Sequence, residues 1–141
     1  MKKTLVRFFG GAVMACAALL ALPTSAHAQS FRLVITADPL SGSARQSLPG
    51  SIQVKNDGEF ATTNVTVTLR PPKGAKVDAA GCQVDHFPGG LRSYTCVLGT
   101  LTPGQPAEVT FSISMPDSGE IVVEVSSDQT SAGAMLPITI S

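Results

Sequence analysis

The side chains with the most chemical potential gather between positions 82 and 96. Cys82 and Cys96 enclose an acid, a histidine and a serine, which are Asp85, His86 and Ser93. A hydrolase of the Ser-His-Asp type needs these three residue types oriented together beside an oxyanion hole. Asp85 and His86 are adjacent, however, and adjacent residues of a strand point to opposite faces, which spoils a relay between them. We therefore predict an exposed polar turn here, and a protein that is not an enzyme.

Metal and sugar binding are two further possibilities for these residues. His86 with Met115 and Met135 could offer soft ligands to copper, but core packing explains both methionines better. The acidic residues of 117–120 are too sparse for a calcium loop. Tyr94 either covers the edge of the core or stacks on a ligand. We expect no metal and no cofactor, and a metal or small-ligand carrier remains an alternative.

The first residues have the pattern of an export signal. Three basic residues in the first seven positions precede an uncharged apolar run over 8–22, and a small-x-small motif follows at 26–28. We predict a signal peptide over 1–28, cleaved between Ala28 and Gln29. The apolar run is shorter than the roughly 20 residues of a spanning helix, so no stable membrane insertion is expected after cleavage. The alternatives are an uncleaved anchor and a lipid on Cys16, but the apolar run continues past Cys16.

Cleavage changes the cysteine count from odd to even. Cys16 leaves with the signal, and Cys82 and Cys96 remain. An even pair in a small exported domain indicates a disulfide, with two free buried thiols as the alternative. This pairing places Gln83 opposite Thr95 in a hairpin, with Val84 opposite Tyr94, Asp85 opposite Ser93, and a turn at Pro88-Gly89-Gly90. Closing a loop of this length stabilises a chain by about 3 kcal/mol.

Apolar and polar residues alternate along most of the mature chain, 29–141, and a period of two is typical of half-buried strands. The clearest strand is 64–69, where Val65, Val67 and Leu69 share a face. No stretch of the mature chain has a helical period. Frequent Pro and Gly turns separate the segments. The pattern predicts a single all-β domain, an immunoglobulin-like antiparallel β-sandwich of seven to eight strands with one hairpin disulfide.

The remaining strands and loops follow from the same alternation. Segment 38–50 has little apolar mass and is expected to be a surface loop, and 126–133 a polar loop. The last strand contains Pro137, which indicates an edge position because proline cannot donate to a ladder. The other expected strands are 31–37 with Phe31, Leu33 and Ile35 inward, 51–56, a weak edge strand at 75–79, 107–115 with Val109, Phe111, Ile113 and Met115 inward, and a strand with Ile121, Val123 and Val125 inward.

The charge of the mature chain limits its partners. Seven basic and ten acidic residues give a net charge of −3, and the basic residues form no stripe in the sequence. Nucleic acid binding relies on such a stripe, because the neutralised phosphates release counterions. We therefore expect no nucleic acid partner and no electrostatic binding to anionic lipid.

Half of the mature chain resembles a known family. The sequence has NVTVTL at 64–69, PPKGA at 71–75, GC at 81–82, YTCVLGTLTPGQ at 94–105 and AEVTF at 107–111. This series is similar to the bacterial Ig-like repeat known as domain of unknown function eleven. The resemblance implies an Ig-like sandwich outside the cytoplasm and carries over no catalytic residues. Such repeats often occur in tandem within long surface proteins, whereas this sequence holds one copy, so a simple stalk role is not expected.

These observations favour a non-catalytic exported module, periplasmic or secreted from a bacterium. We expect it to contact an unknown protein partner or to be a structural component of the cell envelope, with the loops 38–50 and 86–92 as contact surfaces. The alternative is a subunit of a pilus-like or surface fibre that donates its N-terminal strand, residues 31–37, to a neighbouring subunit.

Overall fold

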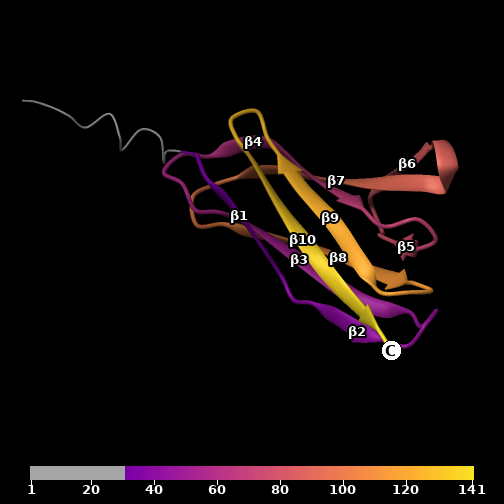
Figure 1. Ribbon diagram of the computed structural model, residues 1–141. Helices are drawn as coiled ribbons and strands as arrows, with labels where there is room; N and C mark the ends of the chain where they lie inside the picture. The colour runs from indigo at the N-terminus through magenta and orange to yellow at the C-terminus, as the bar shows by residue number, and fades with distance from the viewer. Residues whose placement is uncertain (1–30) are drawn as a thin grey trace, which may run out of the picture. The chain divides into compact units, whose positions relative to one another are not determined.

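Two β-sheets make up the part of the protein that the computed structural model describes, residues 31–141 (Figure 1). The predicted signal cleavage between Ala28 and Gln29, and Cys16, lie outside these residues. Within them no helix is both long and apolar enough to cross a membrane. The elements are β1 (Leu33–Ala37), β2 (Leu40–Gly42), β3 (Leu48–Asn56), β4 (Thr62–Arg70), β5 (Lys76–Asp78), β6 (Gln83–Phe87), a 3₁₀ turn (Pro88–Gly90), β7 (Leu91–Leu101), β8 (Pro106–Ser114), β9 (Gly119–Ser126) and β10 (Ser131–Ile140).

The sheets have four and six strands. Their orders are β1-β3-β8-β5 and β2-β10-β9-β4-β7-β6. Every pair of neighbours is antiparallel except β2 and β10, which run parallel. The chain changes sheet between β1 and β2, so the N-terminal strands contribute to the edges of both sheets. The all-β sandwich predicted from the sequence is confirmed, but over residues 31–141 it has ten strands instead of the expected seven to eight, because short strands such as β2 are held by pairing with distant segments.

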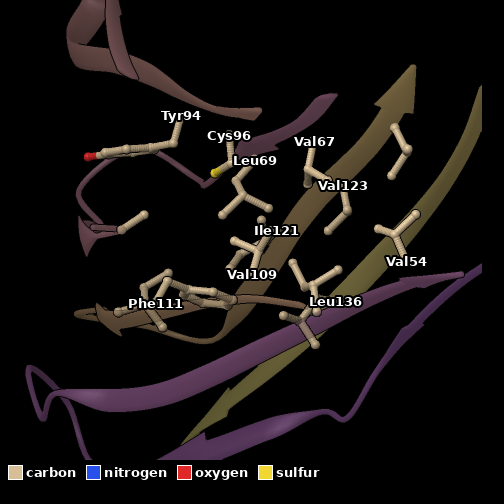
Figure 2. Packing of buried hydrophobic residues seen from close by; sticks show 14 of the residues in the cluster. Val54, Val67, Leu69, Tyr94, Cys96, Val109, Phe111, Ile121, Val123 and Leu136 are labelled. Carbon is tan, nitrogen blue, oxygen red and sulfur yellow. The ribbon is translucent and has the colours of Figure 1, made fainter. Parts of the chain in front are cut away.

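Side chains from both sheets form one core between them. The expected inward faces of β4, β8 and β9 are buried, and Met115 and Tyr94 are buried with them. Figure 2 shows Val109 and Phe111 of the smaller sheet lying near Ile121 and Leu136 of the larger one. Burying such apolar surface is the main favourable term in folding. The alternation of the sequence therefore reports directly which face of each strand points to the core.

The segment 38–50 is not the surface loop that its composition predicted. It contains β2 and the first residues of β3, and Leu48 is only 4% exposed. The backbone of β2 pairs with the end of β10, with Leu40 opposite Ile138. Single leucines among Gly, Pro and Ser give no alternation, so local sequence could not reveal a strand that is held by distant pairing.

Three further expectations are corrected. The expected loop 126–133 is shorter, because β9 continues to Ser126 and β10 begins at Ser131. Their polar side chains face outward, as in the contact of 2.9 Å between the hydroxyl groups of Thr66 and Ser126. β10 is not an edge strand at its C-terminal end, where β2 pairs with Ile138 to Ile140, although Pro137 itself pairs only with Glu120 of β9. Phe31 precedes β1 and is partly exposed, with its ring centroid 5.8 Å from that of Phe60.

The Gly-Thr-Leu-Thr-Pro-Gly run at 99–104 has a structural explanation. Gly99 has a φ of 81° where the pairing of β4 with β7 shifts register, and Gly104 has the same φ in the turn before β8. Both positions favour glycine because its missing Cβ permits positive φ. Leu101 between them is buried, and its carbonyl accepts a bond of 2.8 Å from the side chain of the buried Asn56. The run therefore attaches β7 and β8 to the end of β3.

Candidate functional site

The disulfide predicted from cysteine arithmetic is present. Cys82 and Cys96 are bonded, and their Cα atoms lie 4.3 Å apart. Cys96 is buried in the core, whereas Cys82 is only partly covered. A Cα separation this short is typical of an antiparallel pair whose two backbones do not hydrogen-bond to each other. The bond thus joins the sandwich core to the start of β6.

The hairpin β6–β7 has the predicted register. Gln83 lies opposite Thr95, Asp85 opposite Ser93, and Phe87 opposite Leu91. All five side chains of β6 are exposed. Among the described strands β6 pairs with β7 alone, so its other backbone edge is open. Figure 1 shows β6 and the turn that follows it at the end of this sheet, with no strand beyond them.

The polar residues of the hairpin do not form a catalytic arrangement. Asp85 and Ser93 are cross-strand neighbours, while His86 lies opposite Arg92. Because neighbours in a strand alternate between faces, His86 points away from the face that Asp85 and Ser93 share. No side-chain hydrogen bond joins these three residues in the described part of the chain. The three residue types therefore come close in space without the orientation that a triad needs.

The soft ligands considered for copper are separated. Met115 is buried in the core, but Met135 is 54% exposed on the outer face of β10, so the expectation that both pack in the core is wrong for Met135. Within residues 31–141 there is no group of three or more His, Cys, Asp or Glu side chains placed to hold a metal. Tyr94 is buried in the core, so it packs against the core and is not exposed for stacking on a ligand.

A hollow of about 340 Å³ lies at the base of the hairpin turn, and we call it the tip groove. Its lining includes two large apolar side chains, Phe87 and Leu91, which are 51% and 46% exposed. Pro71, at the end of β4, forms part of the opposite side. Large apolar side chains exposed next to one another on a small domain are typical of a binding surface. The groove is lined by Arg70, Pro71, Phe87, Pro88, Leu91, Arg92 and Ser93.

Positive charge surrounds the tip groove. Arg70 forms an ion pair with Glu124 on β9. Arg92 also lines the groove, and Lys73 lies beside the turn, with its Cε 3.9 Å from the position that a Cβ at Gly90 would take. Neither Arg92 nor Lys73 belongs to the ion pairs found in residues 31–141. The groove thus has an apolar lining and one cation, Arg92, outside those ion pairs, and a second such cation, Lys73, lies beside the turn.

The second predicted contact surface, residues 38–50, has a different character. A wider hollow of about 420 Å³ lies there, formed by residues of β2, β3 and β8 together with Asp38. Its aromatic residue, Phe111, is buried, and the backbone around it belongs to strands. It exposes about as much apolar surface as the tip groove, but its lining is more polar.

The strand proposed for donation to a neighbour pairs within its own chain. β1 lies antiparallel to β3, with Leu33 opposite Asn56 and Ala37 opposite Ile52. Leu33 is buried in the core. The fibre alternative therefore gains no support from the position of β1.

Sequence reasoning identified the turn 86–92 but not the whole groove. Pro71 was interpreted only as the end of a strand, and Arg70 only as a charge. Arg70 ends β4 and Pro71 follows it, and β4 lies next to β7 in the sheet. Phe87 and Leu91 flank the turn Pro88-Gly89-Gly90, and this pattern could have predicted exposed apolar side chains at the tip of the hairpin.

Solved structures of other proteins are similar to this chain. An uncharacterised protein from Nocardia farcinica with an immunoglobulin-like fold aligns over 73% of this chain and 81% of its own, with a TM-score of 0.53 and 17% identity. The CARDB domain of PF1109 from Pyrococcus furiosus aligns over 79% of this chain and 96% of its own, with a TM-score of 0.45 and 15% identity. The chitin-binding domain of Chi18aC from Streptomyces coelicolor aligns over 67% and 90%, with a TM-score of 0.43 and 25% identity. The first of these similarities confirms an immunoglobulin-like fold for this chain.

Sequence comparison adds no relatives to this list. No family model matches the chain, and no curated protein matches it.

Proposed function

We propose that this protein is a non-catalytic Ig-like module of the bacterial cell envelope, and that it acts by contacting another protein through the tip of the hairpin β6–β7. One observation carries this proposal: Phe87 and Leu91 are about half exposed beside each other, and the whole of β6 is exposed. Aromatic side chains at a surface are frequent anchors of protein interfaces. An open strand edge next to them adds a second means of contact.

Export to the periplasm or the exterior is part of the proposal. Its support is the signal-like segment 1–28 and the Cys82–Cys96 bond, because disulfides persist in oxidising compartments and are rare in the cytosol. We also propose that the chain is a relative of the Ig-like repeat of domain of unknown function eleven. The positive φ of Gly99 and Gly104 supports this, since it gives a physical reason for two glycines of the shared motif.

The contact is tested by cross-linking in the producing cell. A photoreactive benzophenone side chain replaces Phe87 in one variant and Gln53 in a control variant. Gln53 is also exposed, but it lies on the outer face of the other sheet. We expect a discrete covalent adduct with a protein from position 87 and none from position 53. Equal labelling from both positions, or no adduct from position 87, would contradict a contact at the tip.

A further inference from the structure

We propose that the partner contributes an extended acidic segment, which adds to the open edge of β6 and places a bulky apolar side chain, next to a carboxylate, in the tip groove. This inference rests on the proposed contact function and specifies its partner. Phe87 links the two features, because it ends β6 and also lines the groove. A segment paired with β6 therefore arrives at the groove where the strand ends.

The backbone groups available at the edge follow from the register of the hairpin. Cys82 and Cys96 form a pair without mutual backbone hydrogen bonds, as their Cα separation of 4.3 Å indicates. Such pairs alternate with hydrogen-bonded pairs, so Gln83, Asp85 and Phe87 bond to β7. Val84 and His86 then direct their amide and carbonyl groups away from β7. An incoming strand finds two donors and two acceptors there, which is the requirement for strand addition.

Native proteins usually protect such an edge. Proline, lysine or a bulge in the edge strand blocks pairing with another chain. β6 contains none of the three, since its sequence is QVDHF and its register with β7 is regular. β5, one edge strand of the other sheet, has only three residues and includes Lys76. β1, the opposite edge strand of that sheet, also lacks proline and lysine, so β6 differs from it by the tip groove at its end.

The chemistry of the groove selects the side chains of that segment. Phe87, Leu91 and Pro71 present apolar surface, which favours a bulky apolar side chain. Arg92 and Lys73 lie at the groove and the turn without an acidic partner in residues 31–141. An arginine can bind a carboxylate through two parallel hydrogen bonds. Charge complementarity thus indicates an acidic residue beside the apolar one.

A second copy of this chain fits the edge poorly. The symmetric antiparallel arrangement that uses both Val84 and His86 is centred on Asp85. It places Asp85 directly opposite Asp85 of the other copy, at the close spacing of about 4.5 Å between Cα atoms. Like charges directly opposite each other destabilise a strand pair. The partner segment therefore belongs to a different protein.

The test begins with a selection from a random-peptide phage library on the purified, oxidised protein. We expect enrichment of peptides in which an acidic residue lies next to an aromatic or branched apolar one. A synthetic peptide of the enriched sequence then serves as the probe, and its Kd is measured by calorimetry. Absence of enrichment, or enriched sequences without acidic residues, would overturn the inference.

Two pairs of variants separate the edge from the groove. His86→Pro removes the outward amide, whereas His86→Ala keeps it, so only the proline variant should weaken the peptide, by about fivefold or more. Arg92→Glu reverses a groove charge and should weaken it by about tenfold, while Lys55→Glu makes the same change on the outer face of the other sheet and should have no effect. Thermal unfolding confirms that each variant folds. Equal effects within either pair would overturn the corresponding part of the inference.

Two controls test whether a second copy of this chain or an anionic membrane binds at the hairpin instead of an acidic peptide. Sedimentation measures self-association of the protein, and flotation with phosphatidylglycerol vesicles measures binding to an anionic membrane. Concentration-dependent dimers lost in His86→Pro, or vesicle binding lost in Arg92→Glu, would overturn the choice of an acidic peptide. A cross-link at position 87 without peptide enrichment would leave the proposed contact standing and reject only this description of the partner. Loss of both would reject the contact itself.

Discussion

The centre of the sandwich and the tip of its hairpin differ in side-chain burial and in the number of neighbouring strands, although β7 belongs to both. At the centre, β4 has neighbours on both sides and its inward residues Val65, Val67 and Leu69 are at most 1% exposed. At the tip, β6 has one neighbour and no buried side chain. The centre is stabilised by apolar burial. The tip depends on backbone pairing with β7 and on one covalent bond.

This difference explains where the disulfide lies. Cys96 lies in the core and Cys82 at the start of β6, so the bond joins the two regions at their boundary. A two-stranded hairpin without a buried face is marginal in water. The bond holds β6 in register although no side chain of β6 is buried. The side chains of β6 are therefore available for contact with a partner protein.

The largest effect is expected at the centre, for Leu69→Ala. Leu69 is buried between strands on both sides, and Figure 2 shows it beside Cys96. Truncating a buried leucine costs about 2–5 kcal/mol of unfolding free energy, a large part of the roughly 5–15 kcal/mol of a small domain. Urea denaturation measures the change. Thr68→Ala, on the outer face of the same strand, is the control and should stay within about 0.5 kcal/mol.

The second prediction concerns the boundary, in the double variant Cys82→Ala with Cys96→Ala. Loss of the bond should cost about 3 kcal/mol, because the loop it closes gains entropy in the unfolded chain. Hydrogen exchange should accelerate most at the amides of β6, which has no buried side chain. Cys82→Ala alone should lose a similar amount of unfolding free energy, because it also removes the bond. It leaves Cys96 as a free thiol in the core. A uniform acceleration over β4 and β6 would show that the hairpin is not a separate unit.

The sequence predicted the elements whose side chains alternate in burial. β8 is such a case, because Val109, Phe111 and Ile113 face the core as expected. The register of β6 and β7 also followed from the sequence, because one assumed bond determines every pair along a hairpin. The burial of β8 depends on the alternation of neighbouring residues, and the register of β6 with β7 depends on a covalent bond.

Pairing between distant segments could not be predicted in this way. β2 exists because it lies against β10, nearly one hundred residues later, and its own three residues have no strand pattern. The tip groove has the same origin. Pro71 and Phe87 become neighbours only because β4 and β6 lie on either side of β7. Sequence reasoning could therefore find the turn of the candidate site but not the side of the groove that faces it.

The third prediction tests how tightly the centre is packed. A Cβ at Gly50 would overlap with Cζ of Phe111, so Gly50→Ala must displace the buried ring. We expect a loss of about 1–3 kcal/mol, as for other overpacked cores. Gly133→Ala is the matched control in β10, where the added Cβ meets only the Val123 carbonyl oxygen at 3.7 Å. Urea denaturation of both variants should separate them, and equal losses would show that the ring can move at no cost.

The smallest effect on stability is expected at the tip, for Phe87→Ser and Leu91→Ser. Both side chains are about half exposed and precede Ser93, the first buried residue of β7. Each variant should unfold within about 0.5 kcal/mol of the original protein, because little apolar surface is returned to water. The same variants should lose the peptide selected on the tip groove, as calorimetry would record. If either variant were destabilised as much as Leu69→Ala, the tip would belong to the core, and its exposed side chains would be explained by folding instead of by a partner.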